Sequence, residues 1–216
     1  RFYVARMVTE RGGRFCRGSV VRIDPAGKRL ELASGETLAY DVASCNVGSE
    51  VVLDGFAPGP RLVPVKPVAN LAMARQTLLE QAGTAPLSLA VVGAGPAGCE
   101  VAGNLRRLLD DHELHGTVQL FSGGKLLEGA PPGVQRHLRR NFAGRGVVSR
   151  DGRALGGEDG VLRLDDGSES RFDLVVLTSG ILPPRLFADS GLAVGADGGL
   201  EVNRFLQAPA APELFG

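Results

Sequence analysis

This sequence has no excess of charge of either sign, because 24 lysine and arginine residues balance 24 aspartate and glutamate residues. Balanced charge creates no field to attract phosphates or an anionic membrane, and there is no long basic block, so nucleic-acid binding gains no support. No apolar run approaches the roughly 18 residues that a membrane-spanning helix requires, so no membrane association is visible. The first six residues do not resemble a signal peptide, and we expect a soluble, uncleaved chain.

Cysteine is also scarce. The three cysteines, Cys16, Cys45 and Cys99, form no CxxC or CxxxxC motif and do not cluster with the three histidines. We therefore expect neither a disulfide framework nor a zinc or other metal site. An isolated cysteine among apolar residues is more often a small buried side chain than a reactive thiol, so we assign no catalytic role to any of the three.

Glycine, in contrast, is abundant: the chain has 31 glycines in 216 residues, about twice the usual share of roughly 7%. This abundance indicates many tight turns and close backbone approaches. In the first part of the chain, turn residues separate the β-like runs Phe15–Ile23, Lys28–Leu32 and Leu38–Val47. These runs predict a hairpin-rich unit of about fifty residues, which is too small to hold a core by itself.

The central part of the chain has the alternating pattern of an α/β domain. Residues 68–83 carry apolar side chains at helical spacing, ending with Ala82, and predict a linker helix. The continuous apolar run Leu87–Val92 predicts a buried parallel strand. A helix over 97–110 and a strand over 117–121 would complete a βαβ unit. Further elements are predicted as a helix over 132–142 and strands over 146–148, 161–164 and 172–177, and the residues after 182 as glycine-rich loops.

The motif G-x-G-x-x-G lies between the first strand and helix of this βαβ unit, at Gly93, Gly95 and Gly98. In this context Gly93 permits the tight turn, Gly95 lets a pyrophosphate approach the backbone, and Gly98 allows close packing of helix on strand. The helix N-terminus offers free N–H groups and a positive dipole end to the phosphates. Pro96 suits the first helical position, where no donor is needed.

Two other interpretations of this turn remain. The glycines could serve a sharp strand-to-helix turn and bind nothing. A methyltransferase-type nucleotide site also follows a strand with a glycine-rich turn, but the spacing and Pro96 favour a dinucleotide.

The end of the second strand bears on the choice between NAD and NADP. An acidic residue there normally bonds the ribose 2′-hydroxyl and repels a 2′-phosphate. This sequence has Ser122, followed by Lys125, and no arginine in the segment to clamp a phosphate. Arg136 on the next helix is a reserve candidate, although a solvated helix face explains it more simply. The preference stays open, and we expect NADPH to bind within about tenfold of NADH.

Three segments resemble one family. Leu89–Glu100 contains VVGAGPAGCE and resembles the motif GxGxxGxE, including its glutamate. Tyr40–Ser49 is similar to a "YD…ATGS" segment that lies against a flavin, and Phe172–Gly180 to a "D…ATG" segment where the chain leaves the NAD domain. On these segments the chain resembles the FAD-dependent pyridine nucleotide-disulfide oxidoreductase superfamily, in its type II NADH dehydrogenase-like branch.

The resemblance implies a Rossmann-like three-layer α/β fold with a complete NAD(P) domain inserted in a partial FAD domain. The expected parts are a partial FAD-binding domain at 1–66, the linker helix at 67–84, the NAD(P)-binding domain at 85–182 and the return segment of the FAD domain at 183–216. The family's N-terminal FAD fingerprint and C-terminal Gly-Asp segment are not found here. The chain is therefore expected to be a middle portion that binds FAD weakly or not at all.

The resemblance also implies an activity: NAD(P)H delivers hydride to FAD, and the electrons pass to a small-molecule acceptor such as a quinone. The residues expected at the cofactors are Gly93, Ala94, Gly95, Pro96, Ala97, Gly98, Glu100, Ser122 and Gly180, with Asn46, Gly48 and Ser49 on the flavin side. Glu100 equally suits a role as an acid near the helix N-terminus. No side chain is identified as a general acid, base or nucleophile.

Alternatives of another class stay open. The chain could be a nicotinamide-nucleotide sensor without catalysis, since fold does not determine function, or part of a selenium-metabolism flavoprotein that differs in its electron acceptor. For the parent enzyme the resemblance implies a cytoplasmic location, with peripheral attachment at the inner face of the membrane left open, and allows a homodimer.

Overall fold

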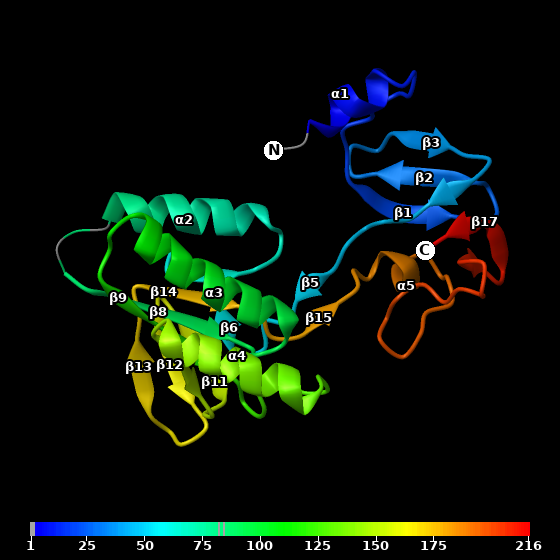
Figure 1. Cartoon of the computed structure of the whole chain (residues 1–216). Coiled ribbons are helices and arrows are strands. Elements are labelled where there is room, and N and C mark those ends of the chain that lie inside the picture. The colour runs from blue at the N-terminus through cyan, green and yellow to red at the C-terminus, as the bar shows by residue number, and fades with distance from the viewer. Residues whose placement is uncertain (1–2, 82, 84) are drawn as a thin grey trace. The chain divides into compact units, whose positions relative to one another are not determined.

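The computed structural model describes residues 3–81, 83 and 85–216, and the chain divides into two compact units (Figure 1). The smaller unit combines Arg1–Gly48 with Pro183–Gly216, and the larger unit is Ser49–Leu182. Ala82 and Thr84, at the end of the expected linker helix, lie outside the described residues.

A five-stranded parallel sheet forms the centre of the larger unit, in the order β10-β9-β8-β14-β7. Its strands are β7 (Leu62–Pro64), β8 (Leu87–Val92), β9 (Gly116–Phe121), β10 (Val147–Arg150) and β14 (Leu174–Leu177). From β8 the chain continues outward to β9 and β10, whereas β14 and β7 lie on the other side of β8. The carboxyl end of β8 is therefore a topological switch point, the position where open α/β sheets bind ligands.

Two further layers cover the sheet. Helices α2 (Ala69–Gln81), α3 (Pro96–Asp111) and α4 (Pro132–Gly144) pack on one face. On the other face lies an antiparallel meander of β11 (Ala154–Glu158), β12 (Val161–Leu164) and β13 (Glu169–Arg171), with β6 (Phe56–Ala57) at its edge. The expected Rossmann-like three-layer α/β fold is confirmed.

The continuous apolar sequence of Leu89–Val92, the last four residues of β8, follows from this double coverage. Successive side chains of a strand point to opposite faces. Leu89 and Val91 join the core under the helices, whereas Ala90 and Val92 join the core under the meander. All four are at most 5% exposed, so neither face of this part of the strand tolerates a polar side chain.

The boundary of the larger unit differs from the expectation. The sequence placed residues 1–66 in one segment, but the structure assigns residues from Ser49 onward to the larger unit. There β5 (Glu50–Val51) pairs with β15 (Ile181–Leu182), β6 with β11, and β7 with β14. These strands have only two or three residues, too few to show a period in the sequence.

Leu62 gives a test of this boundary. Its side chain is fully buried in the core between sheet and meander, so Leu62→Ala is expected to destabilise the larger unit by about 3 kcal/mol. Leu53→Ala, at a position that is 39% exposed, is the matched control and should cost no more than about 0.5 kcal/mol. Hydrogen exchange of the β8 amides measures this stability; unchanged protection in Leu62→Ala would place residues 49–66 outside the cooperative unit.

Both ends of the described chain contribute to the smaller unit. The antiparallel strands β1 (Val20–Asp24), β2 (Arg29–Leu32) and β3 (Thr37–Ala39) form one sheet, and β4 (Ala43–Ser44), β17 (Ala211–Phe215) and β16 (Gln207–Ala208) form another. Helices α1 (Val4–Thr9) and α5 (Leu186–Asp189) complete it. The core joins Ile23 to Phe187 and Leu214, so the two segments fold together.

Two predictions for this unit were wrong. The residues after 182 are not only loops, since they form α5, β16 and β17, and β17 pairs in parallel with β4. The strand expected over 15–23 is confined to β1, which begins at Val20. The elements of the return segment have two to five residues. They depend on contacts with the distant first segment, which local patterns do not encode.

Candidate functional site

Glycine occupies the three positions of the turn between β8 and α3 for different structural reasons. Gly93 has φ +105°, and a Cβ there would lie 2.8 Å from Thr178 Oγ1. A Cβ on Gly98 would lie 1.8 Å from the carbonyl oxygen of Gly93, so this position admits no side chain. Gly95 differs, because a Cβ there would meet no atom within 4 Å. Gly93 and Gly98 therefore serve internal packing, whereas Gly95 keeps space open in front of the helix.

The N-terminus of α3 is accessible and uncapped. Gly95 is the N-cap, no side chain caps it, and Pro96 is the first helical residue. Gly95, Pro96 and Ala97 are exposed. The first turn contains no acidic residue, and the first N–H groups of a helix have no partner within the helix. Their partial positive charge and the open space at Gly95 suit an anionic group such as a pyrophosphate.

Neighbouring strands hold the turn in place from both sides. The N–H of Gly93 donates to the carbonyl oxygen of Phe121 at the end of β9, at 2.9 Å. The hydroxyl of Thr178, which follows β14, lies 2.8 Å from the carbonyl oxygen of Val92 and 3.0 Å from that of Gly93. Sequence reasoning did not name Thr178 as a site residue, although it belongs to the "D…ATG" segment that carried the resemblance.

A cavity of about 420 Å³ opens at the carboxyl ends of β8, β9 and β14. It brings together three of the predicted site residues: Gly93, Ser122 and Gly180. Residues that the sequence did not indicate also line it: Val52, Asp54, Phe56, Arg153 and Leu155. These come from the segment before β7 and from the meander, so only the fold places them at the end of β8.

The other predicted residues lie as follows. Glu100 is exposed on α3, beyond the first turn and outside the cavity lining. Ser49 accepts a hydrogen bond from Nζ of Lys66 in the larger unit. Asn46 and Gly48 belong to the smaller unit, where both are exposed. Their roles at a flavin stay predictions.

Cys99 is a structural residue of this site. Its side chain is buried and its Sγ donates to the carbonyl oxygen of Ala94 at 3.6 Å. Burial raises the pKa of the Cys99 thiol to about 11, and the neighbouring Glu100 carboxylate adds to the shift. The thiol therefore stays protonated at neutral pH and is no nucleophile. Among the residues that the structure describes, no group of three or more histidine, cysteine and acidic side chains could hold a metal ion.

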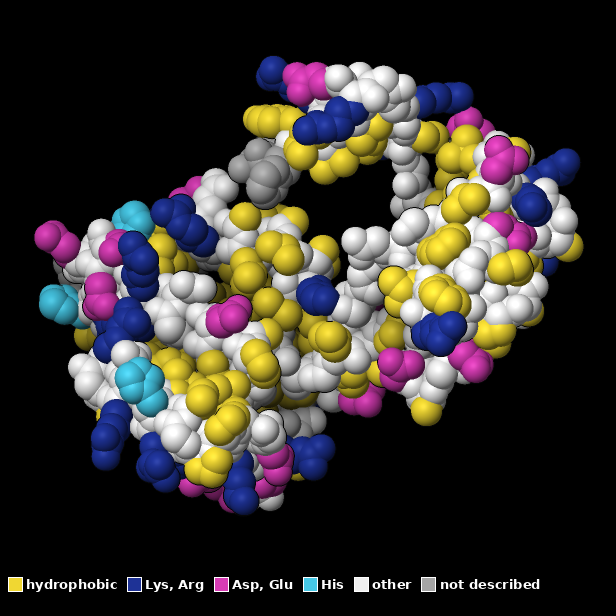
Figure 2. Space-filling model, turned by 45° about the vertical axis from the view of Figure 1, so that its right-hand side comes forward, with side chains coloured by type: hydrophobic (Ala, Val, Ile, Leu, Met, Phe, Trp, Pro, Cys, Tyr) yellow, Lys and Arg dark blue, Asp and Glu magenta, His cyan; other side chains and the backbone are white. Residues whose placement is uncertain are grey.

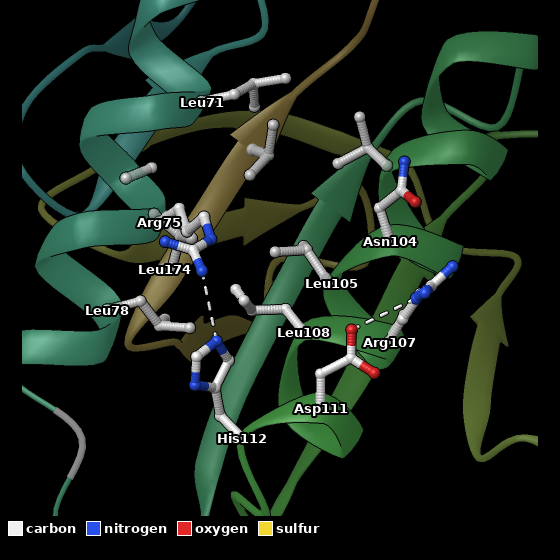
Figure 3. A pocket seen from close by; sticks show the side chains of 13 residues that line it. Leu71, Arg75, Leu78, Asn104, Leu105, Arg107, Leu108, Asp111, His112 and Leu174 are labelled. Carbon is white, nitrogen blue, oxygen red and sulfur yellow. Dashed lines mark hydrogen bonds and ion pairs between the residues drawn. The ribbon is translucent and has the colours of Figure 1, made fainter.

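A second cavity, of about 310 Å³, lies between α2 and α3 on the helical side of the sheet (Figure 3). Leu71, Leu78, Leu105 and Leu174 give it an apolar lining. At its rim an Arg75 Nη lies 3.3 Å from His112 Nε2. This cavity involves the later turns of α3 and none of the predicted cofactor residues.

The charged surface agrees with the balanced composition. Figure 2 shows basic and acidic side chains interspersed on the visible face, with apolar side chains between them. No helix in the described ranges is long and apolar enough to cross a membrane.

The parallel sheet and its glycine-rich strand-to-helix turn define a protein of the Rossmann-like α/β class. The chain belongs to the pyridine nucleotide-disulphide oxidoreductase family, whose sequence model matches residues 7–216. This match confirms the superfamily that the sequence motifs indicated.

Individual relatives support the same placement. The chain is 25% identical over 201 residues to the NADH dehydrogenase-like protein YutJ of Bacillus subtilis, covering 92% of this chain and 55% of that protein. It is 28% identical over 204 residues to rhodocoxin reductase of Rhodococcus erythropolis, covering 90% of this chain and 45% of that protein. The chain thus spans about half the length of these curated relatives.

Solved structures confirm the fold. The crystal structure of a ferredoxin reductase from Rhodopseudomonas palustris superposes with a TM-score of 0.79 at 21% identity, covering 100% of this chain and 52% of that one. Reduced CoADR-RHD of Bacillus anthracis superposes with a TM-score of 0.78 at 21% identity, covering 98% and 39%. At this level of identity the similarity concerns the fold alone.

Proposed function

We propose that this chain is the pyridine-nucleotide-binding part of a flavoprotein oxidoreductase. The observation that carries the proposal is the uncapped N-terminus of α3 behind the open position at Gly95, at the switch point of a parallel sheet. That arrangement suits a pyrophosphate, and family membership supports a dinucleotide as its source. When bound, NAD(P)H supplies a hydride and FAD accepts it, and the protein contributes orientation and electrostatics.

The proposed roles of this chain's residues follow the site geometry. The N–H groups at Ala97 and Gly98 hold the pyrophosphate at the first turn of α3. Ser122, after β9, lies at the adenosine end, and Gly180, after β14, lies at the nicotinamide end. Glu100, outside the cavity lining, is assigned to the nicotinamide end on the family resemblance alone. The larger unit, which contains the expected domain 85–182, is then the NAD(P)-binding domain.

FAD fits this chain less completely. Within the described residues no second strand leads through a G-x-G-x-x-G turn into a helix, so these residues offer no second pyrophosphate site of that kind. We propose that the smaller unit, with Asn46 and Gly48, and the adjacent Ser49 contribute flavin contacts within a longer protein. The bond from Lys66 to Ser49 would orient that hydroxyl.

For the electron acceptor we propose only a chemical class. A small molecule such as a quinone remains our first candidate from the family resemblance. A small electron-transfer protein is the second candidate, favoured by the similar structure of a putidaredoxin reductase in covalent complex with putidaredoxin, which has a TM-score of 0.75.

The first test is a calorimetric titration of the purified chain with NADH and then NADPH at fixed salt. We expect saturable binding of one dinucleotide per chain. Far-UV circular dichroism of the same sample establishes that the chain is folded. A folded chain that binds neither dinucleotide would overturn the proposal.

A further inference from the structure

The turn after β9 carries no negative side chain that could exclude a phosphate. The residue that follows the strand is Ser122, and its Oγ bonds the local backbone, at 2.7 Å from the carbonyl oxygen of Gly124 and 3.1 Å from that of Arg150. The serine hydroxyl is thus already used within the turn. It does not replace the acid that, in NAD-binding sites, accepts the hydrogen bond of the ribose 2′-hydroxyl.

An arginine lies directly against this turn. A Cβ built on Gly123 would lie 3.3 Å from Cγ of Arg153 and 3.5 Å from its Cβ. Both Arg153 and Ser122 line the cavity at the end of β8. Arg153 is 30 residues beyond Gly123 in the sequence, at the entrance to β11. The meander therefore brings a second cation to this turn, in addition to Lys125 of the βαβ unit.

The backbone of Arg153 is fixed while its side chain stays available. Its N–H donates to Asp165 Oδ1 at 3.1 Å, and its carbonyl oxygen accepts the N–H of Asp165 at 2.9 Å. The side chain is exposed, and among the described residues it has no ion-pair partner. Because hydrogen bonds hold the backbone of Arg153 and its guanidinium has no ion-pair partner among the described residues, this side chain is well suited to bind an anionic ligand.

Three carboxylates lie near the turn: those of Asp54, Glu128 and Asp165, whose Oδ1 accepts the N–H of Arg153. Asp54 lines the cavity from the segment between β5 and β6. Glu128 follows the turn in the sequence, and its Oε2 lies 3.9 Å from the Cβ position of Gly124. None of these three is the residue that directly follows β9, from which an acid would bond the ribose; that residue is Ser122.

From these contacts we propose that Arg153 binds the 2′-phosphate of NADPH and makes this site prefer NADPH over NADH. The inference rests on the proposed dinucleotide function and specifies its substrate. A planar guanidinium can donate two parallel hydrogen bonds to a phosphate, and charge-assisted bonds of this kind are stronger than neutral ones. NADH has only a hydroxyl at that position and gains little from the cation.

The test compares the two dinucleotides in Arg153→Gln, with Arg171→Gln as the matched control. Arg171 is an exposed arginine of β13 in the same meander, outside the cavity lining. We expect the original chain to bind NADPH more tightly than NADH, by up to about tenfold. Arg153→Gln should weaken NADPH binding by about tenfold or more and change NADH binding by less than about twofold. Arg171→Gln should leave both affinities unchanged.

Other outcomes would overturn the inference in distinguishable ways. Equal losses of NADH and NADPH in Arg153→Gln would show that the arginine stacks on the adenine, which both dinucleotides share. An unchanged affinity for NADPH in Arg153→Gln would show that the side chain of Arg153 does not contact the ligand. If the original chain is folded and binds neither dinucleotide, the proposed function itself fails. Arg153→Lys, which keeps the charge but loses the planar fork, is expected to retain part of the preference.

Discussion

Gly95→Val is expected to weaken the binding of both NADH and NADPH by more than about a hundredfold, equivalent to about 2.8 kcal/mol. The physical reason is the open space at this position, where a Cβ meets no atom within 4 Å. A valine side chain would occupy the volume that a pyrophosphate needs in front of the α3 N-terminus. Since the Cβ meets no atom in the unliganded protein and Gly95 is exposed, the fold should persist. Calorimetric titration gives the affinities, and far-UV circular dichroism checks the fold.

Gly103→Val is the matched control for this substitution. Gly103 lies on the same helix, and a Cβ there also meets no atom within 4 Å, but it is remote from the N-terminus of α3 and outside the cavity lining. This variant carries the same side chain and should bind both dinucleotides as the original chain does. Undiminished affinity in Gly95→Val would remove the helix terminus as the phosphate site.

Gly98→Val should act on stability instead. A Cβ there would lie 1.8 Å from the carbonyl oxygen of Gly93 and 2.8 Å from Thr178 Oγ1. The first contact is with backbone in the tight turn, so α3 would have to move away from β8. We expect a loss of about 3 kcal/mol or more in the stability of the larger unit, at the upper end of the usual cost of overpacking. The measurement is hydrogen exchange of the β8 amides, compared with Gly103→Val.

The two substitutions separate the roles within one motif. Gly95→Val should remove binding and leave stability, whereas Gly98→Val should lower stability first and binding as a consequence. A Gly98→Val chain as stable as the Gly103→Val chain would mean that α3 does not need its close approach to β8.

The regular elements around the site could be predicted from the sequence because their patterns are local. The strand expected over Leu87–Val92 is β8 at the same residues. The helix expected over 97–110 begins and ends one residue further out, at Pro96 and Asp111. A short strand ending in four apolar residues, a glycine turn and a helical spacing of apolar residues each occupy a short stretch of the sequence. Nearby residues suffice to specify them.

The strands β5, β6 and β7 could not be predicted from local patterns. Each has two or three residues, and each exists because a partner strand distant in sequence supplies its hydrogen bonds. The same holds for β17, whose partner β4 precedes it by most of the chain. For that reason the expected boundary at residue 66 and the loops expected after 182 did not match the structure.

The residues of the candidate site likewise fall into those that the sequence predicts and those that only the fold brings together. The sequence by itself determined the glycine turn, the helix that follows it and the absence of an acid after β9, because all of these lie within one βαβ unit. Only the tertiary structure decided that the hydroxyl of Thr178 bonds the turn at Val92, which is 86 residues away in the sequence. It also decided that Arg153 lies against Gly123. Those contacts arise from the parallel pairing of β14 with β8 and from the packing of the meander on the sheet. Both depend on where distant segments meet in the folded chain, which no local pattern records.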